Sequence, residues 1–165
     1  MIIKSPFPDV DIPEVALPHF VLQKAAERGD KPAIIEAPTG RVITYSELVD
    51  SIRRVAVNLS RRGFKKGDVF GILSPNVPEY AIAFHAVASL GGIVTTINPV
   101  YTDREIEHQL KDSGARFLVT LPGCLEKVTN AARAANVEEV FVFGEAEGAT
   151  PFASLQVETD EPMPQ

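Results

Sequence analysis

The sequence predicts an α/β fold in which a parallel sheet carries helices on both faces, with a small β-hairpin near the N-terminus. Two observations lead to this fold class. Short, continuous apolar runs, typical of buried parallel strands, alternate along the chain with segments whose apolar residues recur at helical spacing. Turn and capping residues separate the two kinds of segment, so strands and helices should follow one another with right-handed crossovers.

The first part of the chain is expected to lie outside this sheet. Residues 1–16 are rich in proline and predict an extended arm on the surface, because proline disfavours regular structure. Pro18 and Gly29 mark the two ends of an expected helix, following the usual placing of proline in the first turn and glycine after the last. The strand-like runs 33–37 and 42–44 are joined by turn residues and predict the hairpin.

Two helices are expected to begin at capping boxes. In the first, the Thr44 hydroxyl can accept an N–H of the opening turn while Glu47 reaches back to the Thr44 backbone. Thr102 and Glu105 repeat the same pattern. A glycine follows each helical segment, as expected at a helix C-terminus.

The remaining elements complete an alternating order. Residues 78–90 form a segment that is apolar almost all round, which predicts a helix buried on more than one side, and Asn76 is expected to help cap it. A last helix is expected around residues 125–135. The strands of the sheet are expected at residues 69–73, 93–97, 117–120 and 140–143.

The pattern divides the chain into three parts. The arm, residues 1–16, precedes an α/β unit over residues 17–155, which includes one expected helical turn at 152–155. Residues 156–165 predict an acidic linker to segments further along a longer protein, and residues 159–165, which contain two prolines, are expected to be mobile.

Composition limits the function classes. The chain has 165 residues, 45% of them hydrophobic, which is enough for one core. It has no apolar run near the ~20 residues that a membrane-spanning helix needs, so no span is expected. A single cysteine excludes an internal disulfide framework and fits a reducing compartment, so we expect a cytoplasmic protein. The net charge of −6 comes from residues 134–165, and nucleic-acid binding is not expected.

One basic cluster interrupts this balance. Its members are Arg53, Arg54, Arg61, Arg62, Lys65 and Lys66. Most of them lie on or just after the end of one helix, where positive charge suits the helix dipole. The favoured interpretation is a solvated face; the alternative is a surface for a membrane or for the phosphates of a ligand.

No catalytic or metal-binding constellation is evident. The segment 74–78 lies between a strand and a helix, where parallel sheets often bind anions, but Pro75 and Pro78 remove two N–H donors and no glycine opens the backbone. A capping role is therefore favoured over a phosphate site. The histidines and the single cysteine do not have metal-ligand spacing, so no metal is expected.

Several short motifs occur together over residues 15–155. In order, they are Ile43-Thr44-Tyr45-Ser46-Glu47-Leu48, Lys66-Gly67-Asp68-Val69, Pro75-Asn76 with Pro78-Glu79, Gly91-Gly92, Asn98-Pro99 and the segment from Glu105 to Gly114. In combination and spacing, the chain resembles the N-terminal part of the adenylate-forming (AMP-binding) enzymes, closest to 4-coumarate–CoA ligases and other acyl-CoA synthetases, with firefly luciferase also similar. The resemblance implies a flavodoxin-like half of the large N-terminal domain.

The resemblance also implies a chemistry for the parent protein. In such enzymes a carboxylate attacks the α-phosphate of Mg²⁺-bound ATP, giving an acyl-adenylate, and a thiol, usually CoA, then displaces AMP. The phosphate loop, the nucleotide-binding residues and the catalytic lysine of the family lie downstream of the matching segment. No catalytic residue is therefore assigned here, and the isolated chain is expected to be inactive and to bind no cofactor by itself. The acid substrate, aromatic or fatty, stays open.

One pair of candidate site residues follows from the same resemblance. Asn98 and Tyr101 follow a strand, in a segment that in acyl-CoA synthetases lies near the channel that admits CoA. A plain strand-ending turn is the favoured alternative. Two further interpretations of the whole chain stay open: a natural short, non-catalytic interaction module that reuses this half-fold, and a stand-alone nucleotide-binding domain, which has the least support. An excised unit is also expected to expose apolar surface and to self-associate.

Overall fold

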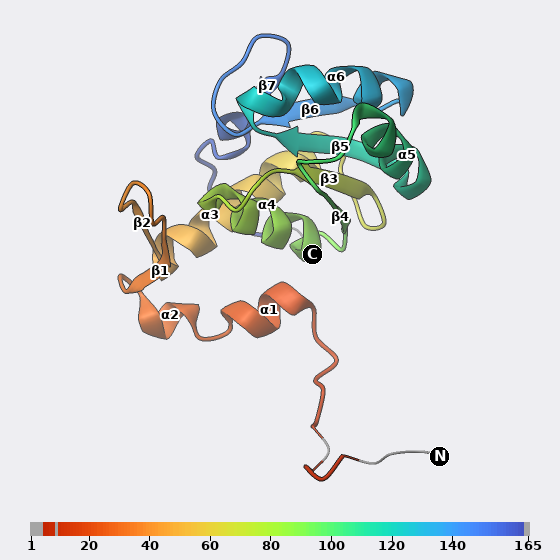
Figure 1. Ribbon diagram of the computed structural model, residues 1–165. Coiled ribbons are helices and arrows are strands. Elements are labelled where there is room, and N and C mark those ends of the chain that lie inside the picture. Colours follow the sequence, from red (N-terminus) through yellow and green to blue (C-terminus); the bar gives the residue numbers. More distant parts are fainter. Residues whose placement is uncertain (1–4, 9, 164–165) are drawn as a thin grey trace.

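The computed structural model describes residues 5–8 and 10–163, and its centre is a five-stranded sheet (Figure 1). The strands are β3 (Val69–Leu73), β4 (Ile93–Ile97), β5 (Ala115–Thr120), β6 (Glu139–Val142) and β7 (Thr150–Pro151). All neighbouring strands are parallel, in the order β4-β3-β5-β6-β7. The order reverses direction between β3 and β5, which is the flavodoxin-like winding. The predicted fold class is confirmed.

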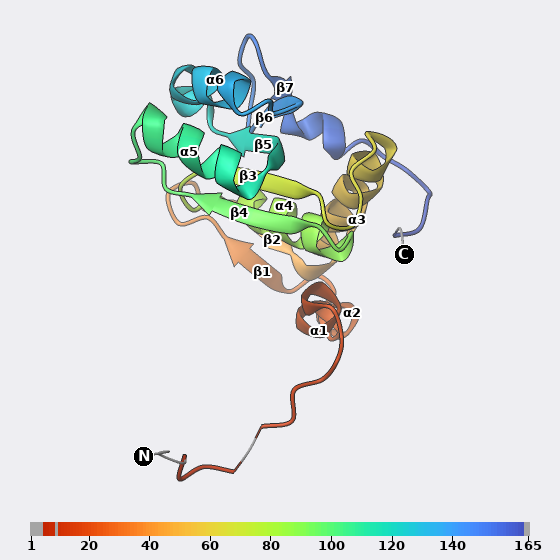
Figure 2. The same ribbon diagram turned by 90° about the vertical axis from the view of Figure 1, so that its right-hand side faces the viewer.

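Helices cover both faces of the sheet. One pair is α3 (Tyr45–Arg61) and α4 (Pro78–Ser89), and the other is α5 (Asp103–Ser113) and α6 (Leu125–Ala134). Figures 1 and 2 show α5 and α6 on one side of the sheet and α3 and α4 on the other. Within the described part of the chain, no helix combines the length and the apolar character needed to cross a bilayer.

The two faces bury two separate cores. The core under α3 and α4 contains Phe64, Phe70, Phe117 and Phe141 beside aliphatic side chains. The core under α5 and α6 is built from aliphatic side chains such as Leu110. Strand side chains alternate between the two cores, as the pleat of a strand requires.

The N-terminal region lies outside the five-stranded sheet. Strands β1 (Pro32–Ile35) and β2 (Val42–Thr44) form the predicted antiparallel hairpin. The single helix expected between residues 18 and 29 is wrong, because the chain forms two short helices, α1 (Leu17–Leu22) and α2 (Ala25–Arg28), separated by two residues. Of the predicted arm, residues 5–8 and 10–16 are exposed and contain no helix or strand, while residues 1–4 and 9 lie outside the described residues.

Both predicted capping boxes are present. The backbone N–H of Glu47 donates to the Thr44 hydroxyl at 3.2 Å, and the Thr44 N–H donates to Glu47 at 2.8 Å. Thr102 and Glu105 form the same pair of bonds, at 3.4 and 2.8 Å. These hydrogen bonds lower the pKa of both glutamates, because the backbone N–H stabilises the ionised form.

The expected side-chain cap of α4 is absent. Pro78 occupies the first helical position, which places Val77, rather than Asn76, at the N-cap. Valine has no side-chain acceptor, and its backbone is extended, as the residue before a proline prefers. Proline itself starts this helix, because its fixed φ suits the first turn and its missing N–H needs no partner there.

The C-terminal region departs from the expected pattern. Strand β7 adds two residues to the sheet edge that no apolar run predicted, and the short 3-10 turn η2 (Phe152–Leu155) matches the expected helical turn. Residues 159–165 were expected to be mobile, but the structure places 155–161 against α3, where side chains of the helix hydrogen-bond to the backbone of this segment. Residues 164 and 165 of the predicted linker lie outside the described residues.

Candidate functional site

The carboxyl edge of the sheet is the natural place to look for a site. Parallel strands end together there, and the strand order reverses between β3 and β5, which opens a crevice in open α/β sheets. At this point the Thr120 hydroxyl is fully buried and has no hydrogen-bond partner among the described residues. Loops after β3, β4, β5 and β6 surround the edge.

The loop after β3 does not resemble a phosphate cradle. The Ser74 side chain is buried and its hydroxyl donates to the carbonyl of Pro75 at 2.8 Å. A cavity of about 300 Å³ lies beside this loop, next to the ends of β5 and β6. Its lining is mainly apolar and consists of Val77, Glu79, Leu121, Phe143, Gly144, Phe152, Ala153 and Gln156. The one carboxylate in this lining, Glu79, pairs with Arg41 at 2.6 Å.

The loop after β4 contains both sequence-predicted site residues. Asn98 closes a tight turn, since its carbonyl accepts from the Tyr101 N–H at 3.0 Å and its side-chain oxygen accepts from the Val100 N–H at 3.1 Å. The turn then runs directly into the capping box of α5. The structure therefore contains the strand-ending turn that was the plain alternative, and a role in admitting CoA stays a prediction.

A lysine from another helix fastens this turn. The Lys127 ammonium on α6 donates to the carbonyl of Pro99 at 3.1 Å. It also lies close enough to Glu105 to contribute to the lowered pKa of that carboxyl, after the larger effect of the Thr102 hydrogen bonds. Lys127 is a site residue that the sequence did not reveal. It reaches the turn because α6 packs beside α5 in the fold.

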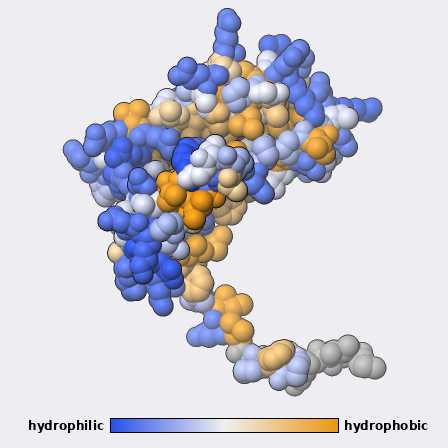
Figure 3. Space-filling view, turned by 60° about the vertical axis from the view of Figure 1, so that its left-hand side comes forward, coloured by the Kyte–Doolittle hydropathy of each residue, from blue (hydrophilic) through white to orange (hydrophobic). Residues whose placement is uncertain are grey.

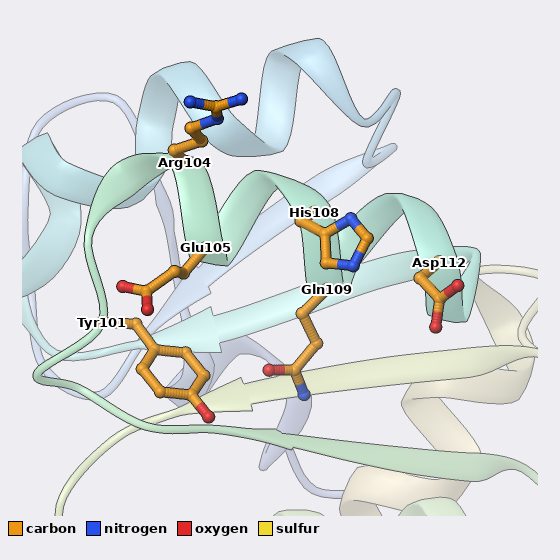
Figure 4. Close-up of a pocket in the computed structure, with 6 residues that line it drawn as sticks. All are labelled: Tyr101, Arg104, Glu105, His108, Gln109 and Asp112. Carbon is orange, nitrogen blue, oxygen red and sulfur yellow. The ribbon is translucent and has the colours of Figure 1, made fainter.

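A groove of about 580 Å³ runs along α5 from this turn (Figure 4). It is lined by Tyr101, Arg104, Glu105, His108, Gln109 and Asp112. Tyr101 lies at its mouth, whereas Asn98 does not line it, so only one of the two predicted residues reaches the groove. The lining mixes two carboxylates with Arg104 and His108, which does not favour one sign of ligand charge.

Gln109 gives the groove its floor. Its side-chain amide donates to the Thr95 hydroxyl at 2.9 Å and to the carbonyl of Thr96 at 3.0 Å, and both residues belong to β4. Strand β4 is at the edge of the sheet, so this amide takes up a carbonyl that has no neighbouring strand. In Figure 4, Tyr101 and Gln109 lie below α5, while Arg104 points upward from the start of the helix.

Away from the groove, some titratable groups of the described residues are half-buried singly, as His85 is, and others are held in ion pairs, as Arg116 is with Asp68 and Glu138. Burial lowers the pKa of His85 on α4, and its buried Nδ1 has no hydrogen-bond partner among the described residues. The described residues contain no group of three histidine, cysteine or carboxylate side chains able to hold a metal ion. Three members of the basic cluster, Arg53, Arg61 and Arg62, contact the C-terminal region of the chain itself.

Comparison with known proteins decides the family. The family model described as "AMP-binding enzyme" matches residues 21–162. The chain belongs to the AMP-binding enzyme family. This confirms the resemblance seen in the sequence motifs.

Curated relatives in this family are CoA ligases. The chain is 40% identical over 134 residues to 4-coumarate–CoA ligase 4 of Arabidopsis thaliana, an alignment that covers 78% of this chain and 24% of the relative. It is 37% identical over 156 residues to 4-coumarate–CoA ligase 3 of Oryza sativa subsp. japonica, covering 94% of this chain and 28% of the relative. The chain thus spans about a quarter of the length of the curated relatives that it matches.

Solved structures give the same fold. A long-chain-fatty-acid–CoA ligase from Archaeoglobus fulgidus superposes with a TM-score of 0.82 at 27% identity, covering 98% of this chain and 34% of that one. The luciferase-like enzyme of the mealworm Zophobas morio superposes with a TM-score of 0.84 at 22% identity, covering 92% of this chain and 38% of that one. At that identity the second comparison supports the fold alone.

Proposed function

We propose that this chain is the N-terminal part of an ATP-dependent carboxylic acid–CoA ligase. The observation that carries the proposal is the alignment of 94% of the chain with a 4-coumarate–CoA ligase at 37% identity. In the proposed reaction a substrate carboxylate attacks the α-phosphorus of ATP and pyrophosphate leaves. The sulfur of CoA then attacks the acyl carbon of the acyl-adenylate, and AMP leaves. Either an aromatic or a fatty acid fits this scheme.

The chain alone is proposed to lack this activity. Such chemistry needs donors and cations placed around the transferring phosphate and a site that excludes water. Among the described residues, the loop after β3 has its serine turned back onto the backbone, where the hydroxyl donates to the carbonyl of Pro75. We therefore expect ATP, Mg²⁺ and CoA to be used by a longer protein rather than by this unit.

The turn at Asn98 and Tyr101 is proposed as one wall of the path for CoA. Its position at the carboxyl edge of β4 and its fastening by Lys127 support this role, since a rigid turn can guide a long, flexible ligand. Within the longer protein, Tyr101→Ala is expected to raise the KM for CoA. The adenylation half-reaction should stay unchanged, and a parallel loss of both would point to misfolding instead.

The first test is ATP–pyrophosphate exchange with a panel of aromatic and fatty acids. The chain of 165 residues, shown to be folded by circular dichroism, should give no exchange. A longer product of the same coding sequence should give acid-dependent exchange. Exchange by the short chain would overturn the proposal that this chain alone is inactive. A stop codon directly after Gln165 would favour the alternative, a non-catalytic interaction module.

Two further expectations belong to this proposal. We propose a cytoplasmic location, supported by the single cysteine, and self-association of the isolated unit through exposed apolar side chains. Ile12 is 81% exposed, and Ile35 on the hairpin is 63% exposed. Figure 3 shows apolar surface on the N-terminal segment and near its junction with the body. A clean monomer in light scattering at high concentration would contradict self-association.

A further inference from the structure

The C-terminal segment from residue 155 to residue 161 lies along helix α3 with a regular pattern of contacts. Side chains of α3 hydrogen-bond to four of its backbone carbonyls. These carbonyls belong to Leu155, Val157, Thr159 and Glu161. They belong to every second residue: Leu155 ends the turn η2, and the segment from Val157 to Glu161 contains no helix or strand. We call residues 155–161 the strap.

Two donors on the helix account for all four carbonyls. The Asn58 amide donates to the carbonyls of Leu155 at 3.0 Å and Val157 at 3.3 Å. The Arg53 guanidinium donates to the next two acceptors, the carbonyls of Thr159 at 2.8 Å and Glu161 at 2.7 Å. Because the earlier donor on the helix takes the later pair of carbonyls, the strap runs antiparallel to α3.

One strap side chain is also recognised. Thr159 is only 7% exposed, and its hydroxyl accepts from Arg61 at 3.2 Å and from the Glu161 N–H at 3.2 Å. Arg61 also pairs with the Glu161 carboxylate at 2.7 Å, but both of these side chains are about half exposed, and such ion pairs contribute little. Glu158 and Asp160 are exposed. Contacts to the backbone therefore dominate over contacts to the acidic side chains.

We propose that the face of α3 formed by Arg53, Asn58 and Arg61 is a binding surface for the backbone of a peptide segment without helix or strand, and that its occupant is the strap of the same chain. The surface donates hydrogen bonds to the carbonyls of every second residue and to the hydroxyl of Thr159. This gives the basic cluster a role that differs from both a solvated face and a surface for an external anion. It goes beyond the proposed ligase function and does not depend on it.

The chain at the two ends of the strap also contributes side chains to the core under α3 and α4, which contains the phenylalanine rings. Leu155 at its start is fully buried, and Met163 just beyond it packs against the same core as Phe152. Buried Leu155 at one end and partly buried Met163 just beyond the other therefore anchor the two ends of the strap. The carbonyl contacts hold the polar stretch between them, which has no apolar side chain in the core.

The test is the mobility of the strap backbone, measured by ¹⁵N relaxation on the chain of 165 residues. In the unaltered chain, residues 157–161 should show order parameters near those of the sheet, roughly 0.85. Arg53→Met should lower them below about 0.6, the range of flexible backbone, and leave the sheet resonances in place. Asn58→Ala provides an independent second variant, with the larger effect expected at residues 155–157.

A matched control lies on the same helix. Arg54 pairs with Asp50 at 2.6 Å and has no bond to the strap among the described contacts, so Arg54→Met should leave the strap rigid. If Arg53→Met gives a folded protein with a rigid strap, the proposal is overturned.

A second experiment separates recognition of the backbone from attraction between charges. The combined change Glu158→Gln, Asp160→Asn and Glu161→Gln removes the acidity of the strap but keeps every carbonyl. The strap should stay ordered, and raising the salt concentration should not release it. Release of the strap by this neutralised variant, to the extent expected for Arg53→Met, would show that charge holds it and would overturn the proposal.

Discussion

The two faces of the sheet are packed with different kinds of side chain, aromatic on one face and aliphatic on the other. Under α3 and α4, aromatic rings pack against one another. The centroid of the Phe70 ring lies 6.1 Å from that of Phe64, 6.4 Å from that of Phe117 and 6.1 Å from that of Phe141. Several of these pairs are edge-to-face, the geometry that aromatic quadrupoles favour. Under α5 and α6 the core consists of aliphatic side chains such as Leu110 and Leu118.

This difference suggests a difference in adaptability. An aromatic ring is a rigid plate that moves only as a whole, whereas the terminal methyl groups of a leucine can shift by a change of rotamer. The aromatic face also supports more of the molecule, because the hairpin and the strap both pack on that side. We therefore expect the aromatic face to tolerate changes less well than the aliphatic face.

The largest expected effect is the loss of a central ring. Phe70→Ala should lower the free energy of unfolding by about 3–5 kcal/mol, because it removes a fully buried side chain and leaves a cavity among three rings. Leu110→Ala, the matched change on the aliphatic face, should cost less, near the lower end of about 2–5 kcal/mol. Urea unfolding curves measure both, and a larger loss for Leu110→Ala would reverse the comparison.

Added volume tests the same contrast in the opposite direction. A Cβ at Gly92 would lie 2.5 Å from the Phe64 ring, and a Cβ at Gly71 would lie 2.8 Å from a terminal methyl of Leu118. Overpacking typically costs about 1–3 kcal/mol, so Gly92→Ala should lie at the upper end and Gly71→Ala at the lower end.

Gly123 is the control for these glycine changes. A Cβ there would meet nothing within 4 Å, so Gly123→Ala should stay within about 0.5 kcal/mol of the unaltered chain. The three variants are compared by thermal and urea unfolding. If Gly92→Ala and Gly71→Ala lower the free energy of unfolding equally, the Phe64 ring adjusts to the added methyl group as easily as the Leu118 side chain does.

The smallest expected effect concerns the helix caps, one on each face. Thr44→Ala at α3 and Thr102→Ala at α5 should each cost about 1 kcal/mol, because each removes one first-turn acceptor. The two losses should be similar, since a cap acts locally. A much larger loss at Thr44 would show that the α3 cap is coupled to the aromatic face.

The caps also carry a pH signature. The pKa values of Glu47 and Glu105 are lower in the folded protein than the ordinary value of 4.5. A carboxyl with a depressed folded pKa stabilises the protein above its unfolded pKa, and that contribution is lost as the pH falls through the folded pKa. The difference in the free energy of unfolding between each threonine variant and the unaltered chain should therefore become smaller as the buffer is made more acidic.

Much of the fold could be predicted because its signals are local. The bounds of β3 and β4 match the predicted runs, and both capping boxes form as the threonine–glutamate spacing indicated. The errors lie where a signal depends on neighbours. Strand β7 has two residues and exists only by pairing with β6, and the cap at Asn76 failed because Pro78 fixed the start of α4 one residue further on.

The candidate site was predictable to a smaller extent. The sequence placed Asn98 and Tyr101 in a turn after a strand, and the structure shows the turn, with Tyr101 alone reaching the groove along α5. Lys127 carries no motif that links it to Pro99, 28 residues away in sequence. The two meet because α5 and α6 pack side by side on one face of the sheet.

By itself, the sequence determined the alternation of strands and helices from β3 to β6, the two capping boxes and the resemblance to the family. Each of these depends on side chains that act on their own backbone or recur at a fixed spacing. Only the tertiary structure decided the path of the strap along α3. Every residue of a chain carries the same carbonyl group, so an acceptor leaves no mark in the sequence. The donors Arg53 and Asn58 select four of these carbonyls only because the fold brings the strap beside the helix.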